Sequence, residues 1–582
     1  MTEVASLGTL LGFLILSFMV LCGWGIILKR FLGVPTTHVV DISDFWFGYF
    51  VSLFAYELLN LWLPIDWRVS VIFFGIGFGY FLKHRIANAL NWLLLFRPVT
   101  GAQSILWIAC GAIVIVASFW AMALPINEDS WSYHFQSIRW ANEYPIVPGL
   151  GNLHGRLAFN QSHFGFLALL NFFPYWNKGY AAGGLILWLA TAFTCLSLLA
   201  RYLHHKKVLL LLLLVVIEPL TKYSSSPSPD FAVSLLQVVG MIYLVNVVYG
   251  DSKNPPQKCA DLCTVLLVCA ALCSVKLSGL IYGAALSGVA VWCAKGILGQ
   301  YRRGIMSLLI VIVIFIVVHG IRGIITSGVP LYPSTIGSSL SFDWSVPLER
   351  IQNEAAWIYS CARTGSPCQD PALAMRDWNW LGPWWANLVP THSKLLLVWS
   401  LAAMCAASFA DFLAKNSFLG ARHQDWLLMV PFVAALVFWF LSAPDVRFLG
   451  SMLELMFGLS FWVLICSWDR HLKLSQTFAG GRLVLARKFF QSWNFPTIAS
   501  VTILIFCTRL LPVPAWSWPS LPQPTTSVIT IKNGFSVFEP AGGTCWFMQL
   551  PCSPAVDPYL EYRETEMGDP LAHGFRLRGK PE

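Results

Sequence analysis

The residues best suited to chemistry lie in one polar stretch, residues 125–166, which interrupts a series of apolar segments. It contains two adjacent carboxylates, Glu128 and Asp129. Such groups can act as a general base or bind a divalent cation. The nearby basic and titratable side chains are His134, Arg139, His154, Arg156 and His163. An isolated acidic pair would merely mark a span's end in headgroup water, but this combination indicates a functional loop.

Three basic side chains are expected near the outer ends of apolar segments, namely Lys276 in SVKLSG, Arg322 in HGIRGIITSGVPLYP and Arg447 in SAPDVRFLG. Charges at such depth usually line a cavity, and lysine and arginine suit phosphate oxygens. Snorkelling is the alternative, as is ion pairing, for instance of Arg447 with Glu454. The predicted substrate-binding residues are His154, Arg156, Asp230, Lys276, Arg322 and Arg447, beside the candidate catalytic pair Glu128 and Asp129.

Composition indicates the elements that must position these residues. The chain has 582 residues, of which 57% are hydrophobic and 12% charged, and its mean hydropathy is +0.64. Repeated apolar runs of about 18 to 25 residues can each cross a bilayer core. We therefore expect an all-α polytopic membrane protein. The net charge of +9 is spread over short loops, so it does not indicate a nucleic-acid partner.

Fourteen apolar runs are candidate spans. They are residues 4–27, 43–64, 68–83, 104–124, 179–202, 208–223, 231–250, 258–275, 277–296, 305–325, 394–414, 426–442, 449–468 and 494–512. Alternating them gathers lysine and arginine in short loops on one side, which is typical of the cytoplasm. The amino terminus, loops 125–178 and 326–393 and the tail are therefore expected outside the plasma (inner) membrane. The expected parts are N-terminal helices in 1–103, a catalytic module in 104–512 and an extracytoplasmic tail in 513–582.

Three features are expected on the outer side. Trp131, Phe135, Ile138, Trp140 and Ala141 recur at helical spacing, which predicts an amphipathic helix on the membrane surface. Asn533-Gly534 between two short apolar runs predicts a hairpin in a small tail that docks on the loops. The outer cysteine pairs are Cys361 with Cys368 and Cys545 with Cys552, each seven residues apart. Disulfides are plausible there in an oxidising compartment, and zinc is the alternative.

The order of these features resembles the GT-C superfamily, multispanning glycosyltransferases that use polyprenyl-phosphate-linked sugars. The matching residues are Glu128-Asp129 before a surface helix, Asp230 in SPSPDFAV, Lys276, Arg322 before Gly328, Pro330 and Pro333, and Arg447-Phe448. The resemblance spans residues 104–470. More narrowly, YHFQSIRWANEYPIVPGLGNLHGRLAFNQS is similar to uncharacterised bacterial multispanning proteins of cell-surface polysaccharide synthesis. Its VPGLGNLHGR segment belongs to that narrower group alone, so superfamily substrates do not carry over.

The resemblance implies a GT-C-like bundle and transfer of a sugar from a polyprenyl-phosphate donor to a cell-envelope glycan or lipid acceptor at the outer face of the bilayer. Asp129 would act as general base, and Glu128 would bind a sugar hydroxyl or a divalent cation. The cations would stabilise the leaving phosphate. Two alternatives stay open: a polysaccharide polymerase or ligase, and a lipid-linked-sugar transporter or flippase. The chain shows no internal repeat of the kind that many transporters have.

Overall fold

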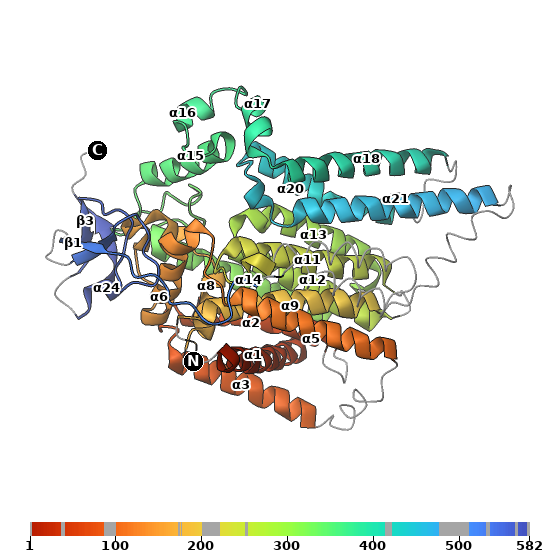
Figure 1. Ribbon diagram of the computed structural model, residues 1–582, viewed down its shortest axis with the longest axis horizontal. Helices are drawn as coiled ribbons and strands as arrows, with labels where there is room; N and C mark the ends of the chain where they lie inside the picture. The colour runs from red at the N-terminus through yellow and green to blue at the C-terminus, as the bar shows by residue number, and fades with distance from the viewer. Residues whose placement is uncertain are drawn as a thin grey trace.

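The computed structural model describes residues 3–35, 41–86, 101–172, 175, 177–200, 221–250, 254–413, 422–476, 511, 513–530, 536–564 and 568–578. Long helices lie side by side, and short helices and strands cover one end of this bundle (Figure 1). The long helices are α1 (Glu3–Leu32), α2 (Ile42–Leu59), α3 (Trp67–Ile86), α5 (Gly101–Ala121), α9 (Gly179–Ala200), α11 (Pro229–Tyr249), α12 (Pro255–Val275), α13 (Leu280–Cys293), α14 (Arg302–Ser327), α18 (Thr391–Leu413), α20 (Val430–Leu441) and α21 (Met452–Gln476).

Six helices in the described part of the chain are long and apolar enough to cross a membrane. They lie in Ser6–Leu32, Gly179–Leu196, Pro229–Tyr249, Pro255–Val275, Arg302–Ser327 and Thr391–Phe412. The protein is therefore a mostly helical, multispanning membrane protein. The expected number of fourteen spans is not reproduced. Most of 208–223 and of 494–512 lies outside the described residues. Charged residues such as Glu57 in α2 and Arg68 in α3 lower the hydropathy of two further expected spans.

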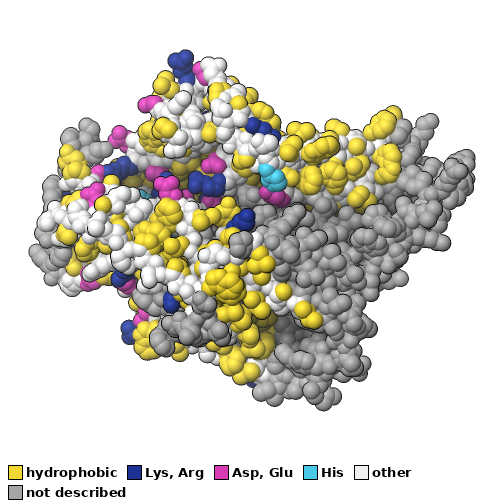
Figure 2. Space-filling view, viewed as in Figure 1, with side chains coloured by type: hydrophobic (Ala, Val, Ile, Leu, Met, Phe, Trp, Pro, Cys, Tyr) yellow, Lys and Arg dark blue, Asp and Glu magenta, His cyan; other side chains and the backbone are white. Residues whose placement is uncertain are grey.

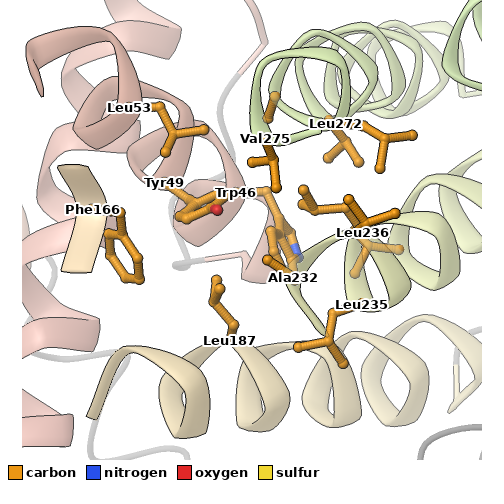
Figure 3. Close-up of a cluster of buried hydrophobic side chains, with 14 of the residues drawn as sticks. Trp46, Tyr49, Leu53, Phe166, Leu187, Ala232, Leu235, Leu236, Leu272 and Val275 are labelled. Atoms are coloured by element: carbon orange, nitrogen blue, oxygen red, sulfur yellow. The ribbon is translucent and has the colours of Figure 1, made fainter. Parts of the chain in front are cut away.

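The N-terminal helices share one core with the rest of the bundle. Trp46 and Tyr49 of α2 pack among Phe166, Leu187 and Leu236, which belong to three other helices (Figure 3). The Trp46 indole N–H also donates to the Thr194 hydroxyl of α9 at 2.9 Å. The expected boundary at residue 103 thus does not separate two hydrophobic cores, and the division of the chain into domains stays a prediction.

Short elements build the covered end of the bundle. They include α6 (Phe135–Glu143), α7 (Leu150–Leu153), α8 (His163–Leu170), α15 (Leu348–Thr364), α16 (Pro371–Ala374), α17 (Leu381–Pro383) and α24 (Pro570–His573). The short helix α19 (Arg422–Leu427) lies instead at the opposite end, where Asp425 accepts from Tyr249 at the end of α11. The N-terminus lies toward this same end in Figure 1, and Phe13 of α1 stacks on Tyr175 with ring centroids 4.3 Å apart. Loops that are distant in sequence therefore meet at one end, which we call the capped end.

The predicted surface helix forms, but its surroundings differ from the prediction. One π-helical turn, Ser130–His134, continues directly into α6. Phe135, Ile138 and Trp140 are buried, and so is Gln136 on the polar side. The Gln136 amide donates to the carbonyls of Trp546 (3.1 Å) and Met548 (3.0 Å) in the tail. The prediction of a helix lying on the membrane surface is wrong in this respect, because the tail covers its polar side.

The C-terminal tail docks on the capped end rather than standing free. Its strands are β1 (Thr526–Thr530), β2 (Ser536–Pro540), β3 (Leu560–Tyr562) and β4 (Phe575–Leu577). They pair antiparallel as β1–β2 and β3–β4, while the predicted turn Asn533-Gly534 lies outside the described residues. Arg350 of α15 forms an ion pair with Asp557. At Gly149 (φ +64°) a Cβ would overlap the Phe575 carbonyl oxygen, so this junction requires glycine.

Both outer cysteine pairs are joined as disulfides, Cys361–Cys368 and Cys545–Cys552. The second loop holds Trp546, whose ring stacks on Trp131 beside the acidic pair with centroids 5.4 Å apart. This disulfide therefore ties a tail loop to the polar stretch predicted to be functional.

Replacing Cys545 and Cys552 together by serine should loosen this docked loop. Closing so short a loop stabilises by about 2–3 kcal/mol, which corresponds to roughly 30- to 150-fold faster opening. Amide hydrogen exchange of residues 536–556 measures the change. Cys361→Ser with Cys368→Ser removes a loop of the same length elsewhere and should leave this exchange unchanged. Equal exchange in both double variants would contradict the clamping role.

Candidate active site at the capped end

Helix geometry separates the two adjacent carboxylates. Asn127 begins the turn after α5, because its side-chain oxygen accepts from the Asp129 backbone N–H at 3.0 Å and its carbonyl accepts from Ser130. Successive side chains in a helical turn point about 100° apart. Asp129 consequently turns inward and is 16% exposed, whereas Glu128 is exposed to solvent. Of the two expected catalytic groups, Asp129 is the one that forms ion pairs within the described part of the chain.

Two arginines hold Asp129 from different parts of the chain. Arg156, which follows α7, contacts one carboxylate oxygen, and Arg447, between α20 and α21, donates to the other at 3.2 Å. The Arg156 Nε also lies 3.9 Å from Glu354 of α15. Both arginine side chains remain partly accessible, at 43% and 50% exposure. They can therefore reach a ligand that arrives from solvent.

A second ion pair lies beside the first. Asp230 in the first turn of α11 pairs with Lys276, the residue that ends α12. The Lys276 ammonium is 4.7 Å and the Arg447 guanidinium 5.2 Å from the centroid of the Phe448 ring. Cation–π attraction therefore places both cations around one ring. Asp129, Arg156, Asp230, Lys276 and Arg447 form what we call the charged cluster.

Charged side chains gather in one region of the molecular surface. Acidic and basic side chains gather between the lobe of α15–α17 and the bundle below it (Figure 2). An extended apolar surface continues along α18 to the right of this region (Figure 2). This face thus combines charged side chains with surface that a bilayer could cover.

Arg322, which the sequence predicts to bind substrate, forms its ion pair outside the charged cluster. It is 3% exposed, and its Nε lies 3.1 Å from the carboxylate of Glu57 in α2. It donates to the Tyr56 hydroxyl at 2.7 Å, and His319 lies 2.9 Å from the other Glu57 oxygen. Arg322 lines an internal cavity together with Arg156. A buried guanidinium needs a charge partner, and Glu57 supplies one here.

His154, another predicted substrate-binding residue, stands two residues before Arg156 in the sequence and is half-buried. Its Nδ1 is enclosed and has no hydrogen-bond partner within the described structure. Burial, and then the positive charge of Arg156, lower the pKa of His154 to about 4. The imidazole is therefore neutral at pH 7, so it can exchange a hydrogen bond with a substrate but cannot supply charge to a phosphate.

Comparison of the sequence with models of known protein families finds one matching family. The profile of the domain of unknown function DUF8201 matches residues 9–453. The chain belongs to this family. The match includes the whole charged cluster and ends before the tail. A search of curated proteins finds no match.

One solved structure is similar to this DUF8201 chain, the arabinosyltransferase EmbB from Mycobacterium smegmatis. Sequence identity is 11% and the TM-score 0.37, over 78% of this chain and 46% of EmbB. The chain thus corresponds to about half of EmbB, and a TM-score below 0.5 carries no argument about fold or activity. Membership of the GT-C superfamily stays a prediction.

The sequence reasoning on this DUF8201 chain missed Glu354 and Glu57. Glu57 carried a usable signal, because a carboxylate within an apolar run normally requires a partner. Glu354 carried none, since it stands among other polar residues of the amphipathic helix α15. Only the tertiary fold brings it to Arg156, where burial raises its pKa.

The residues around Asp129 do not fit the divalent cation that the sequence left open. Both Asp129 oxygens accept from arginines, which repel a metal ion. In the described part of the chain, no group of three histidine, cysteine or acidic side chains could hold a metal. We therefore derive no reaction step through a metal.

Proposed function

We propose that this protein is an integral membrane glycosyltransferase that moves a sugar from a polyprenyl-phosphate donor to a glycan or lipid acceptor. The observation that carries the proposal is the carboxylate of Asp129 held between two accessible arginines at the end of a membrane bundle. A glycosyl transfer from a phosphate needs one base and several cations, and this cluster contains both.

In the proposed reaction, Asp129 accepts the proton of an acceptor hydroxyl. The hydroxyl oxygen forms a bond to the anomeric carbon of the donor sugar, and the bond between that carbon and the phosphate oxygen breaks. The electron pair leaves with the polyprenyl phosphate. Arg447 and Lys276, which flank Phe448, stabilise the charge that develops on this phosphate.

The ion pair between Arg447 and Asp129 would couple donor binding to the ability of Asp129 to accept a proton. Arg447 occupies one oxygen of Asp129, so that oxygen is a poor proton acceptor before the donor arrives. A donor phosphate competes for the same guanidinium and frees the oxygen. Arg156 keeps the other oxygen in place, and Glu354 limits the movement of Arg156. Base activation would thus follow donor binding.

The position of the cluster suits a lipid-linked donor. The capped end stands at the ends of apolar helices, where a polyprenyl chain in the bilayer would present its phosphate. The excess of lysine and arginine in the opposite short loops supports an outer-face location in the plasma membrane, with the N-terminus and tail extracytoplasmic.

The test is transfer of a radiolabelled sugar from polyprenyl phosphate to membrane acceptors by the purified protein in nanodiscs. Arg447→Ala should weaken binding of the lipid phosphate by about 10- to 100-fold, because a charge-assisted contact is worth about 1.5–3 kcal/mol. Arg68→Ala removes an arginine that is 71% exposed and paired with Asp66, so donor binding should not change.

Two results would count against the enzyme. Donor binding without transfer by the wild-type protein, across several donor sugars, would favour a flippase or other carrier. Donor binding unaffected by Arg447→Ala would remove the cluster from phosphate recognition.

A further inference from the structure

A second cavity opens in the outer lobe, in the connection from α15 to α18. The side chains that give it its chemistry are Arg363, Gln369, Asp377, Asn379, Trp380 and Asn387. This mixture of amides, an indole and a guanidinium differs from the neighbouring cavity around Trp439, whose lining is almost entirely apolar. Amides and a guanidinium beside an aromatic wall suit a ligand with many hydroxyls rather than a hydrocarbon chain.

The cavity has a fixed frame. The Cys361–Cys368 disulfide closes the loop that contains Arg363, and the Ser360 hydroxyl donates to the Gln369 carbonyl at 2.6 Å. Gly365 has φ +75°, and a Cβ there would lie 2.6 Å from the Leu388 side chain on the cavity wall. A pre-formed frame lowers the ordering cost of binding a flexible ligand.

Arg363 contributes a positive charge to the cavity without a carboxylate partner among the described residues. Its guanidinium lies 5.2 Å from the Trp380 ring centroid and donates to the carbonyls of Tyr359 (2.9 Å) and Leu441 (3.2 Å). No carboxylate among the described residues lies within ion-pair distance of it, whereas Asp377 stands 3.8 Å from Arg376. A guanidinium has five N–H groups, so donors remain for an anionic ligand.

The cavity is also bonded to the segment that carries Arg447. The Trp384 indole N–H donates to the Pro444 carbonyl at 2.8 Å, and Arg363 donates to Leu441 in the same segment. Trp384 and Arg363 both line the cavity. A ligand bound there would therefore contact residues that are hydrogen-bonded to the segment before Arg447, which belongs to the charged cluster.

We propose that this cavity binds an acidic saccharide unit of the acceptor glycan, with Arg363 holding its carboxylate and Gln369 and Asn387 its hydroxyls. Identifying this saccharide as the acceptor rests on the proposed function. Binding of the saccharide itself does not depend on catalysis. A planar guanidinium binds a carboxylate through two parallel hydrogen bonds, which distinguishes a uronic acid from a neutral sugar.

The test measures binding of fluorescently labelled hexagalacturonate and maltohexaose to the full-length protein in nanodiscs. Hexagalacturonate should bind the wild type more tightly than maltohexaose. Arg363→Gln should weaken its binding by about 10-fold or more, as expected for the loss of a charged hydrogen bond. Arg363→Lys retains the charge and should recover part of the affinity. Asn387→Ala changes an exposed side chain that the fold does not need, and should weaken binding about 3- to 10-fold.

Two controls separate this site from the charged cluster. Trp385→Ala changes a neighbouring tryptophan that lines the apolar cavity instead, and should leave binding unchanged. Asp129→Asn should also retain hexagalacturonate binding, so failure of the transfer reaction and failure of this site are distinguishable.

Three outcomes would overturn the proposal. They are equal binding by wild type and by both Arg363→Gln and Asn387→Ala, equal affinity for the two oligosaccharides, and no hexagalacturonate binding at millimolar concentration. Glycerol 3-phosphate binding that depends on Arg363, without oligosaccharide binding, would assign the site to a lipid headgroup instead.

Discussion

Replacing Asp129 with asparagine is expected to reduce sugar transfer by about 10²- to 10⁴-fold, the usual effect of losing a general base. Asparagine has nearly the same shape, but only its carbonyl oxygen can accept, so it keeps one of the two arginine contacts that the Asp129 oxygens make. It cannot take a proton from the acceptor hydroxyl. The measurement is the initial rate of labelled-sugar transfer by the purified variant under saturating donor.

The affinity of Asp129→Asn for the donor should be retained or increased, in contrast to its loss of transfer. In the wild type, Asp129 competes with the donor phosphate for the Arg447 guanidinium. The neutral amide competes less, so Asp129→Asn should bind the lipid phosphate as tightly as the wild type or more tightly. This combination of lost transfer and retained binding is not expected of a variant that merely misfolds.

Glu128→Gln is the matched control, because it makes the same chemical change one residue earlier in the chain. Glu128 is exposed, and no ion pair to it is found in the described part of the chain, so transfer should fall less than 10-fold. Equal transfer by Asp129→Asn and the wild type would exclude Asp129 as the base. Loss of transfer in Glu128→Gln alone would reverse the roles of the two carboxylates.

The charged cluster was largely accessible to sequence reasoning because of where its members stand. Asp230, Lys276 and Arg447 each interrupt or border an apolar run, and charges at such positions are costly unless they meet a partner. The chain direction then brings alternate helix ends to one side of the membrane. The cost of unpaired charge and the alternation of helix ends together predict that these side chains converge on one side. They do not predict which carboxylate pairs with which cation.

The pairing could not be predicted, because it depends on packing distances of a few ångströms. Arg447 had Glu454 as a candidate partner seven residues away, yet it contacts Asp129, more than three hundred residues away in sequence. The burial of both sides of α6 could not be predicted either, because Gln136 is buried only by contact with the tail. An amphipathic pattern cannot distinguish a membrane surface from a protein surface on the same helix.

Replacing Arg322 should affect folding rather than donor binding, whereas the sequence predicted a substrate-binding role for this residue. Arg322→Ala leaves the fully buried Glu57 without its guanidinium. Removing one partner of a buried ion pair typically costs about 3–5 kcal/mol. The free energy of unfolding, measured by denaturant titration in detergent micelles, should fall by this amount.

The double variant Glu57→Gln with Arg322→Met should recover most of that loss. It removes both charges together and fills the volume of the arginine with an apolar chain, while the introduced glutamine amide can still hydrogen-bond to His319. Replacing a buried pair by neutral groups of similar volume is often close to neutral. Arg447→Ala is the contrasting case: its side chain is half exposed, so stability should change little while donor binding weakens. If Arg322→Ala kept wild-type stability and lost donor binding, Arg322 would belong to the phosphate site after all, and the Glu57 pair would not be its role.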